Sequence, residues 1–131
     1  MPKTVLVVDD DEPTRGLLEM VLREGGYRVE QARDGLDALE LVERARPDVI
    51  VLDRSLPRLG GTEFVHAYRA RPGDHAPVVA LCASVDAHGW AASIGAAASV
   101  GKPFGIEELL AAVATAIELT RTAPAREHAS T

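Results

Sequence analysis

The sequence predicts an α/β protein in which five strands alternate with five helices, so that helices cover both faces of one parallel sheet. The first observation is a set of continuous apolar runs at residues 5–8, 49–52 and 78–82. Such runs are typical of strands buried on both faces. The second observation is the helical spacing of apolar residues between these runs. The third is length, because 131 residues suffice for one domain with one core.

Residues 4–8 form the first predicted strand, and residues 11–13 (Asp-Glu-Pro) have the composition of a helix start. An acidic side chain can cap the free N–H groups there, and proline suits the first helical turn. Two glycines at 25–26 end this helix. Residues 27–32 alternate apolar and polar side chains, which indicates a strand nearer the sheet edge. Residues 36–45 then have helical spacing again.

The middle of the chain is organised around residues 49–53, where an apolar run leads directly into an aspartate. We expect this segment to be the central strand of the sheet. Two glycines at 60–61 interrupt the chain, and apolar side chains within residues 64–68 indicate a third helix. The fourth strand is expected over residues 78–82, since it is apolar throughout.

The last third of the chain completes the alternation. We expect a short helix over residues 86–94, a fifth strand over residues 98–101 and a final helix over residues 107–117. Two glutamates open this last helix, where acidic side chains complement the helix dipole. Residues 1–120 therefore form one predicted domain, and the polar residues 121–131 are expected to be a frayed or disordered tail.

Composition argues against several classes of protein. The net charge is -6 and the pI is near 5.1, the opposite of the basic surface of a nucleic-acid binder. One cysteine excludes an internal disulfide and fits a reducing compartment. No apolar run approaches the roughly 20 residues of a membrane span, and the N-terminus lacks the layout of a signal peptide. We expect a cytoplasmic protein that contacts neither nucleic acid nor membrane directly.

Carboxylates follow the first and third predicted strands. Asp9 and Asp10 come after the first strand, and Asp53 ends the central one. Right-handed crossovers place such strands side by side, and open α/β sheets bind ligands at the carboxyl ends of their strands. Like charges this close raise one another's pKa unless a cation is present, and Mg²⁺ prefers oxygen ligands. The alternative is an acidic helix start at Asp9 and Asp10 and a turn cap at Asp53.

A lysine follows the fifth predicted strand. Lys102 precedes Pro103, and its side chain can reach over the same edge of the sheet. An ammonium group is a compact charge suited to a phosphate. The alternative is a solvated surface lysine, which is the usual environment of this residue type.

Three motifs occur in order, each at the end of a predicted strand: Val7-Val8-Asp9-Asp10, then Leu52-Asp53 with Pro57 and Gly61, then Lys102-Pro103-Phe104. This ordered set resembles the receiver domain of bacterial two-component response regulators. The resemblance extends from residue 4 to about residue 119. It implies a flavodoxin-like, doubly wound sheet of five strands in the order 2-1-3-4-5.

The resemblance implies that Asp53 is the phosphoacceptor, which attacks a phosphohistidine on a sensor histidine kinase or a phosphotransfer protein. Asp10, Asp53 and the backbone carbonyl of Ser55 would hold Mg²⁺, and Asp9 would contribute through water. Lys102 would pair with the phosphoryl oxygens. Self-phosphorylation with Mg²⁺ and slow self-dephosphorylation are the most that such a domain catalyses. A Mg²⁺-dependent phosphatase would need an acid–base aspartate where Ser55 stands.

Two positions depart from the family pattern. The fourth strand of a receiver usually ends in Thr or Ser, whose hydroxyl binds the phosphoryl group, whereas this chain has Cys82. A thiol is a weak donor, and the alternative role of Cys82 is a small buried apolar residue. Ala83 keeps the small side chain that lets a phosphate approach. The fifth strand usually carries Tyr or Phe as an aromatic switch, whereas this chain has Ser99. We therefore expect an atypical switch.

We interpret the chain as a single-domain response regulator of a two-component phosphorelay, with an unidentified downstream target. One alternative is the receiver fragment of a longer transcriptional regulator. Another is a receiver-like interaction module that does not use phosphorylation, which Cys82 and Ser99 favour and the intact acidic residues and Lys102 oppose. Dimerisation through the fourth helix, fifth strand and fifth helix is common in the family, and the sequence leaves it open.

Overall fold

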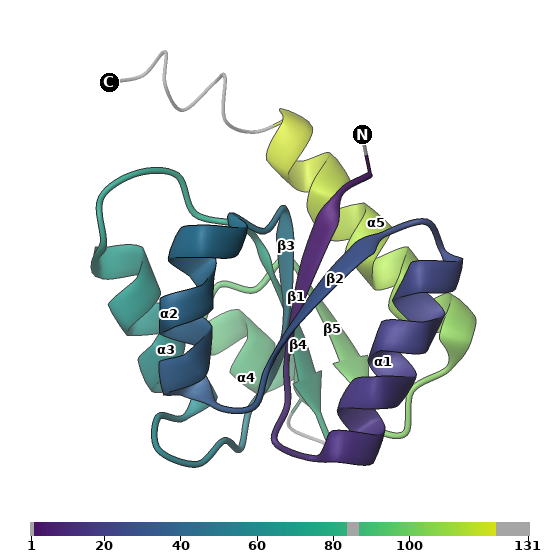
Figure 1. Cartoon of the computed structure of the whole chain (residues 1–131), viewed down its shortest axis with the longest axis horizontal. Coiled ribbons are helices and arrows are strands. Elements are labelled where there is room, and N and C mark those ends of the chain that lie inside the picture. Colours follow the sequence, from purple (N-terminus) through teal and green to yellow (C-terminus); the bar gives the residue numbers. More distant parts are fainter. Residues whose placement is uncertain (1, 84–86, 123–131) are drawn as a thin grey trace.

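The computed structural model describes residues 2–83 and 87–122, which form a five-stranded sheet flanked by helices (Figure 1). Neighbouring strands are parallel and follow the order β2-β1-β3-β4-β5, which confirms the predicted fold class. The strands are β1 (Thr4–Val8), β2 (Arg28–Ala32), β3 (Val49–Asp53), β4 (Val78–Cys82) and β5 (Ala98–Gly101). The helices are α1 (Glu12–Glu24), α2 (Gly35–Ala45), α3 (Gly61–Ala70), α4 (Ala87–Ser93) and α5 (Ile106–Thr122).

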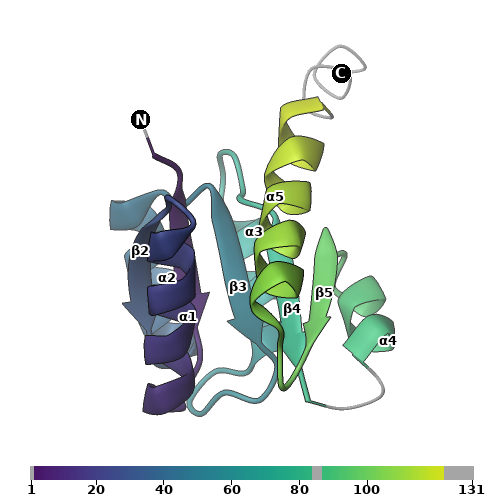
Figure 2. The same cartoon turned by 90° about the vertical axis from the view of Figure 1, so that its right-hand side faces the viewer.

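An apolar core lies on each face of the sheet. Figure 2 looks onto the face covered by α1 and α5, where Leu18, Leu22 and Leu109 are fully buried. Helices α2, α3 and α4 cover the other face, where Phe64 and Trp90 pack (Figure 1). Each large apolar side chain that is fully buried contributes roughly 1.5–3 kcal/mol to stability. Because helices seal both faces, a ligand meets the sheet at the ends of its strands.

The burial of each strand follows its sequence pattern. All five residues of β3 are buried in the middle of the sheet, as its continuous apolar run predicts. Exposed and buried side chains alternate at the start of the edge strand β2, as predicted. The register of β1 and β3 pairs Val8 with Leu52. These two strands therefore end at the same level, and the residues that follow them meet.

Aspartate side chains cap the helices that follow β1 and β2. Asp11 Oδ2 accepts a hydrogen bond from the Thr14 N–H at 3.0 Å, and Asp34 Oδ1 accepts one from the Asp37 N–H at 2.8 Å. Such caps satisfy N–H groups that have no partner within the helix. Both turns lie at the carboxyl edge of the sheet, so the caps help to shape that edge.

Several predicted boundaries differ from the structure by a few residues. Strand β2 begins at Arg28 because the N–H of Tyr27 still donates to the Leu22 carbonyl and belongs to the end of α1. Helix α5 continues to Thr122, whereas residues 123–131 of the expected tail lie outside the described residues. The domain boundary at residue 120 stays a prediction. Within the described part of the chain, no helix has both the length and the apolar character that a membrane crossing requires.

Two glycines allow a matched test of the packing at the end of β3. A Cβ atom at Gly61 would lie 2.8 Å from the Asp53 carbonyl oxygen and 2.9 Å from Trp90 Cζ2. We expect Gly61→Ala to lower the free energy of unfolding by about 1–3 kcal/mol. Gly16 on α1 has no neighbour within 4 Å of a Cβ, so Gly16→Ala should raise this free energy by up to about 1 kcal/mol. Urea denaturation measures both, and equal effects would contradict the close contact.

Candidate functional site

The carboxyl edge of the sheet, at the bottom of Figure 1, gathers the predicted acidic and basic residues. Asp9 directly follows β1, Asp53 is the last residue of β3, and Lys102 directly follows β5. These three strands are parallel members of one sheet, with β3 between β1 and β4. Strand ends at one edge thus bring together side chains that are far apart in sequence.

Three carboxylates form a cluster that could hold a metal ion. One oxygen from each of Asp9, Asp10 and Asp53 lies within 4.8 Å of the others. Asp9 and Asp53 are buried, at 0% and 6% exposure, whereas Asp10 is exposed. A cluster of oxygen ligands open to solvent on one side suits Mg²⁺, which keeps several of its waters. Proximity of the three carboxylates is therefore as the sequence predicts.

Lys102 lies between the two buried carboxylates. Its Nζ atom is 3.1 Å from Asp9 Oδ2 and 3.2 Å from Asp53 Oδ1. Burial of the ammonium group works against its charged form, but the Asp9 and Asp53 carboxylates outweigh it, so the pKa of Lys102 is raised. Lys102 is therefore fixed by two ion pairs, and it is not the solvated surface lysine of the alternative interpretation.

The surroundings of Asp53 make its carboxyl group harder to ionise. Burial raises the pKa of Asp53, and the negative charge of Asp9 raises this pKa further. Lys102 opposes both effects, but the pKa of Asp53 remains above its ordinary value of 3.8. The ionised pocket is thus short of positive charge, which favours a bound cation.

The Asp9 carboxylate is held in place by one of its oxygens, while the other lies in this negatively charged pocket. Its Oδ1 accepts the Asp11 N–H at 2.9 Å, and its main-chain carbonyl accepts a hydrogen bond from Arg15 Nη1 at 2.8 Å. Its Oδ2 is buried and accepts no hydrogen bond of good geometry from the described residues, although the Lys102 ammonium is close enough for an ion pair. A fixed carboxylate whose second oxygen has only the Lys102 ammonium as a partner among the described residues fits a hydrated divalent cation.

The remaining predicted residues surround this cluster. Ser55 lies in the β3–α3 loop (residues 54–60), two positions after Asp53, and Ala83 is an exposed residue just after β4. Cys82 ends β4 and is buried, and its carbonyl accepts the Lys102 N–H at 3.1 Å. The register pairs Ser99 with Ala80 on the neighbouring strand. The roles of Ser55, Cys82, Ala83 and Ser99 stay predictions.

Trp90 and its neighbours beside the site were missed by the sequence analysis. Its indole N–H donates to Thr62 Oγ1 at 2.9 Å, and the Arg54 guanidinium lies 5.8 Å from its ring centroid. Arg54 follows Asp53 directly, so this cluster connects α4 with the segment that carries the acid. The single tryptophan in a segment rich in alanine and glycine was the available signal.

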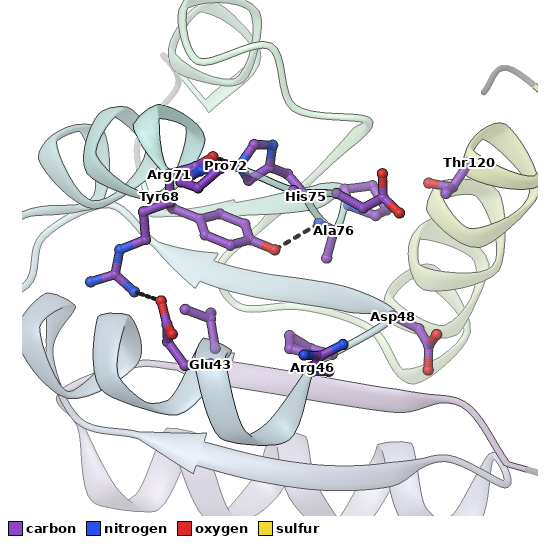
Figure 3. A pocket seen from close by; sticks show the side chains of 14 residues that line it. Glu43, Arg46, Asp48, Tyr68, Arg71, Pro72, His75, Ala76 and Thr120 are labelled. Atoms are coloured by element: carbon purple, nitrogen blue, oxygen red, sulfur yellow. Dashed lines mark hydrogen bonds and ion pairs between the residues drawn. The ribbon is translucent and has the colours of Figure 1, made fainter. Parts of the chain in front are cut away.

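A hollow of about 450 Å³, separate from the acidic cluster, lies near the opposite, amino-terminal end of the strands (Figure 3). Several of its polar groups already have partners. Arg71 Nη1 is 2.7 Å from Glu43 Oε2, Asp48 Oδ2 accepts the Thr4 N–H at 2.8 Å, and the Tyr68 hydroxyl accepts the Ala76 N–H at 2.8 Å. This hollow therefore lies at the other end of the sheet from Asp53, and its Arg71–Glu43 ion pair joins the end of α3 to α2.

Known proteins that are similar to this chain are response regulators. A family model described as the response regulator receiver domain matches residues 5–114. Response regulator MprA of Mycobacterium sp. (strain KMS) is 42% identical over 126 residues, which are 95% of this chain and 54% of that protein. The chain thus spans about half the length of the MprA proteins that it matches.

Solved structures show the same fold. The chemotaxis response regulator CheY4 of Vibrio cholerae superposes with a TM-score of 0.81 at 33% identity, over 88% of this chain and 99% of that chain. The receiver domain of the Francisella response regulator 1452 superposes with a TM-score of 0.80 at 31% identity, over 90% of this chain and 98% of that chain.

Because the pKa of Asp53 is raised, replacing this carboxylate with a neutral amide should stabilise the fold, by an amount that depends on pH. Because the folded chain binds the Asp53 proton more tightly than the unfolded chain, ionisation of this group favours unfolding. In Mg²⁺-free buffer at neutral pH, Asp53→Asn should therefore raise the free energy of unfolding. The gain should shrink as the pH falls through the folded pKa and vanish below 3.8. Urea denaturation across this range tests it, with the exposed Asp74→Asn as the unaffected control.

Proposed function

The chain belongs to the response regulator receiver domain family, and from this premise we propose that Asp53 accepts a phosphoryl group from a partner protein. Receiver domains are phosphoacceptor domains of two-component signalling, and they interact with histidine kinases or phosphotransfer proteins. The observation that carries the proposal is the position of Asp53 at the end of β3, buried and 3.2 Å from Lys102 Nζ. The donor is the phosphohistidine of a sensor histidine kinase or a phosphotransfer protein.

The transfer requires little covalent chemistry from the protein. An Asp53 carboxylate oxygen forms a bond to phosphorus while the bond from phosphorus to the histidine nitrogen breaks. The electron pair of the broken bond remains on the imidazole, which leaves as the neutral group after taking up a proton. Lys102 pairs with the phosphoryl oxygens, since its ammonium already lies beside the acceptor oxygen. Positioning and charge neutralisation supply most of the acceleration in such transfers.

Mg²⁺ is the cofactor that the residues present would hold. We assign Asp10, Asp53 and the Ser55 backbone carbonyl as its ligands, with Asp9 acting through water. Two observations support this assignment: the carboxylate oxygens group within 4.8 Å, and the buried Asp9 Oδ2 accepts no hydrogen bond of good geometry from the described residues. Bound there, Mg²⁺ neutralises charge on the phosphoryl oxygens.

The output of this receiver is proposed to be atypical. Cys82 offers a weak thiol donor where the family usually has a hydroxyl, Ser99 replaces the usual aromatic residue, and Ala83 leaves room for the phosphoryl group. The contact of Trp90 with Thr62 gives α4 another connection to the segment after Asp53. A phosphorylation-independent interaction module is the second candidate, and the same two substitutions favour it.

The organisation of the full protein is part of the proposal. We propose residues 1–120 as the receiver, either as a single-domain regulator or as the receiver of a longer transcriptional regulator, with a cytoplasmic location. The MprA relatives, about twice as long as this chain, support the longer form. A homodimer through α4, β5 and α5 is compatible with both forms, and the downstream target is a further protein. We propose no direct contact of this domain with nucleic acid or membrane.

Intact-protein mass spectrometry tests the phosphoacceptor. After incubation with Mg²⁺ and acetyl phosphate, we expect a single added phosphoryl group, which Asp53→Asn abolishes and Asp74→Asn, an exposed aspartate at the other end of the sheet, retains. Incubation with a purified histidine kinase is the second arm. Failure of both donors to modify a chain that binds Mg²⁺ would favour the phosphorylation-independent module.

The atypical switch predicts a gain from restoring a hydroxyl. Cys82→Thr should enlarge the differences in amide chemical shift between the free and phosphorylated chain, because a hydroxyl donates a stronger hydrogen bond to the phosphoryl group than a thiol. Cys82→Val, which matches threonine in shape but has no hydroxyl, is the control and should not enlarge them. If Cys82→Thr and Cys82→Val give the same differences, the hydroxyl is not what limits the response.

A further inference from the structure

An ion pair joins the start of α2 to the β3–α3 loop. Arg58 Nε donates to Asp34 Oδ2 at 2.8 Å, and Arg58 Nη2 donates to Asp34 Oδ1 at 3.0 Å. The planar guanidinium group matches a carboxylate in this arrangement of two parallel hydrogen bonds, which fixes direction as well as distance. We call this contact the Asp34–Arg58 bridge.

The acidic partner of the bridge is firmly anchored. Asp34 is 4% exposed, and its Oδ1 also caps α2 through the Asp37 N–H. The hydrogen bonds from Arg58 hold the pKa of Asp34 below its ordinary value although burial works in the other direction. A buried carboxylate needs such partners. The bridge therefore attaches the loop to a side chain that cannot move without exposing the end of α2.

The backbone on both sides of the bridge is also in close contact. Arg58 has φ +67°, a left-handed conformation that residues other than glycine seldom adopt and that the surroundings must maintain. Next to it, the Leu59 carbonyl oxygen would lie 2.2 Å from a Cβ at Gly35. Residues 34–35 and 58–59 thus form one joint, in which an ion pair and a backbone contact act together.

This joint sets the path of the loop that leaves Asp53. The two ends of the loop are also joined, because the Gly61 N–H donates to the carbonyl of Arg54, the first loop residue, at 3.0 Å. Ser55 lies between these two attachments, two residues after Asp53 and three before Arg58. The position of its backbone carbonyl therefore depends on the joint at Arg58.

We propose that Asp34 and Arg58 are positioning residues that hold the Ser55 carbonyl at the Mg²⁺ site and thereby strengthen Mg²⁺ binding. This inference rests on the proposed function, in which that carbonyl is a ligand. Mg²⁺ demands near-ideal octahedral geometry at short distances, so a displaced ligand is costly. Residues behind the ligands commonly change metal affinity by about 10–100-fold.

Isothermal titration calorimetry with Mg²⁺ on the full chain tests the bridge. We expect Arg58→Gln and Asp34→Asn each to weaken Mg²⁺ binding about tenfold. The double variant should bind no more weakly than either single variant, because both remove the same contact. Arg71→Gln is the matched control, since it removes the 2.7 Å ion pair to Glu43 at the opposite end of the sheet and should leave Mg²⁺ affinity unchanged.

Acetyl phosphate kinetics separate positioning from a merely structural role. In Arg58→Gln, the Mg²⁺ concentration for half-maximal phosphorylation should rise by the factor seen in calorimetry, while the rate at saturating Mg²⁺ stays near that of the unaltered chain. If Arg58 only stabilised the fold, its substitution would lower the melting temperature without shifting the Mg²⁺ concentration for half-maximal phosphorylation.

Two results would overturn the inference, and they are distinguishable. If Arg58→Gln is folded and binds Mg²⁺ as tightly as the unaltered chain, whereas Asp10→Asn loses binding, the bridge has no positioning role and the proposed function stands. If the unaltered chain binds no Mg²⁺, both proposals fail. Should Asp34→Asn fail to fold, Arg58→Gln decides the question alone, because Arg58 is half exposed and its side chain caps no helix.

Discussion

The ion pairs from Lys102 to Asp9 and Asp53 are the interaction on which the site depends. Two buried carboxylates at one edge of a sheet repel each other, and water cannot screen them as it does at the surface. One ammonium group at 3.1 and 3.2 Å neutralises only part of this charge. The pKa of Asp53 therefore stays raised, and a pocket short of positive charge favours the binding of a divalent cation.

The scaffold makes this arrangement possible by holding strand ends in register. Apolar cores on both faces fix β1, β3 and β5, so the acids and the lysine are placed by rigid elements and only the connecting loops need separate support. The Asp34–Arg58 bridge gives that support to the β3–α3 loop, and Gly61 lets α3 begin close to the Asp53 carbonyl. A backbone carbonyl in a loop that acts as a metal ligand is positioned only by the contacts of the surrounding loop residues, so the loop must be restrained.

The two ends of the sheet have different functions. At the amino-terminal end, Arg71 and Glu43 pair with each other and join the end of α3 to α2. At the carboxyl end, the acidic oxygens remain only partly matched. On the α4 side of that end, Trp90 contacts Thr62 and Arg54, and Cys82 and Ser99, on the neighbouring strands β4 and β5, are the proposed switch positions. In the proposed function, the acidic pocket follows the family pattern and the two switch positions do not.

The alternation of strands and helices, the parallel sheet and the meeting of Asp9, Asp10, Asp53 and Lys102 could all be predicted from the amino-acid sequence. Those features follow from local patterns, since an apolar run defines a strand and the residue after it must lie at the sheet edge. Only the tertiary structure decided that Asp9 is buried while Asp10 is exposed, and that Asp34 meets Arg58 and Trp90 meets Thr62. These pairs lie 24 and 28 residues apart, and each joins segments whose approach depends on how helices pack on the sheet, which no local pattern encodes.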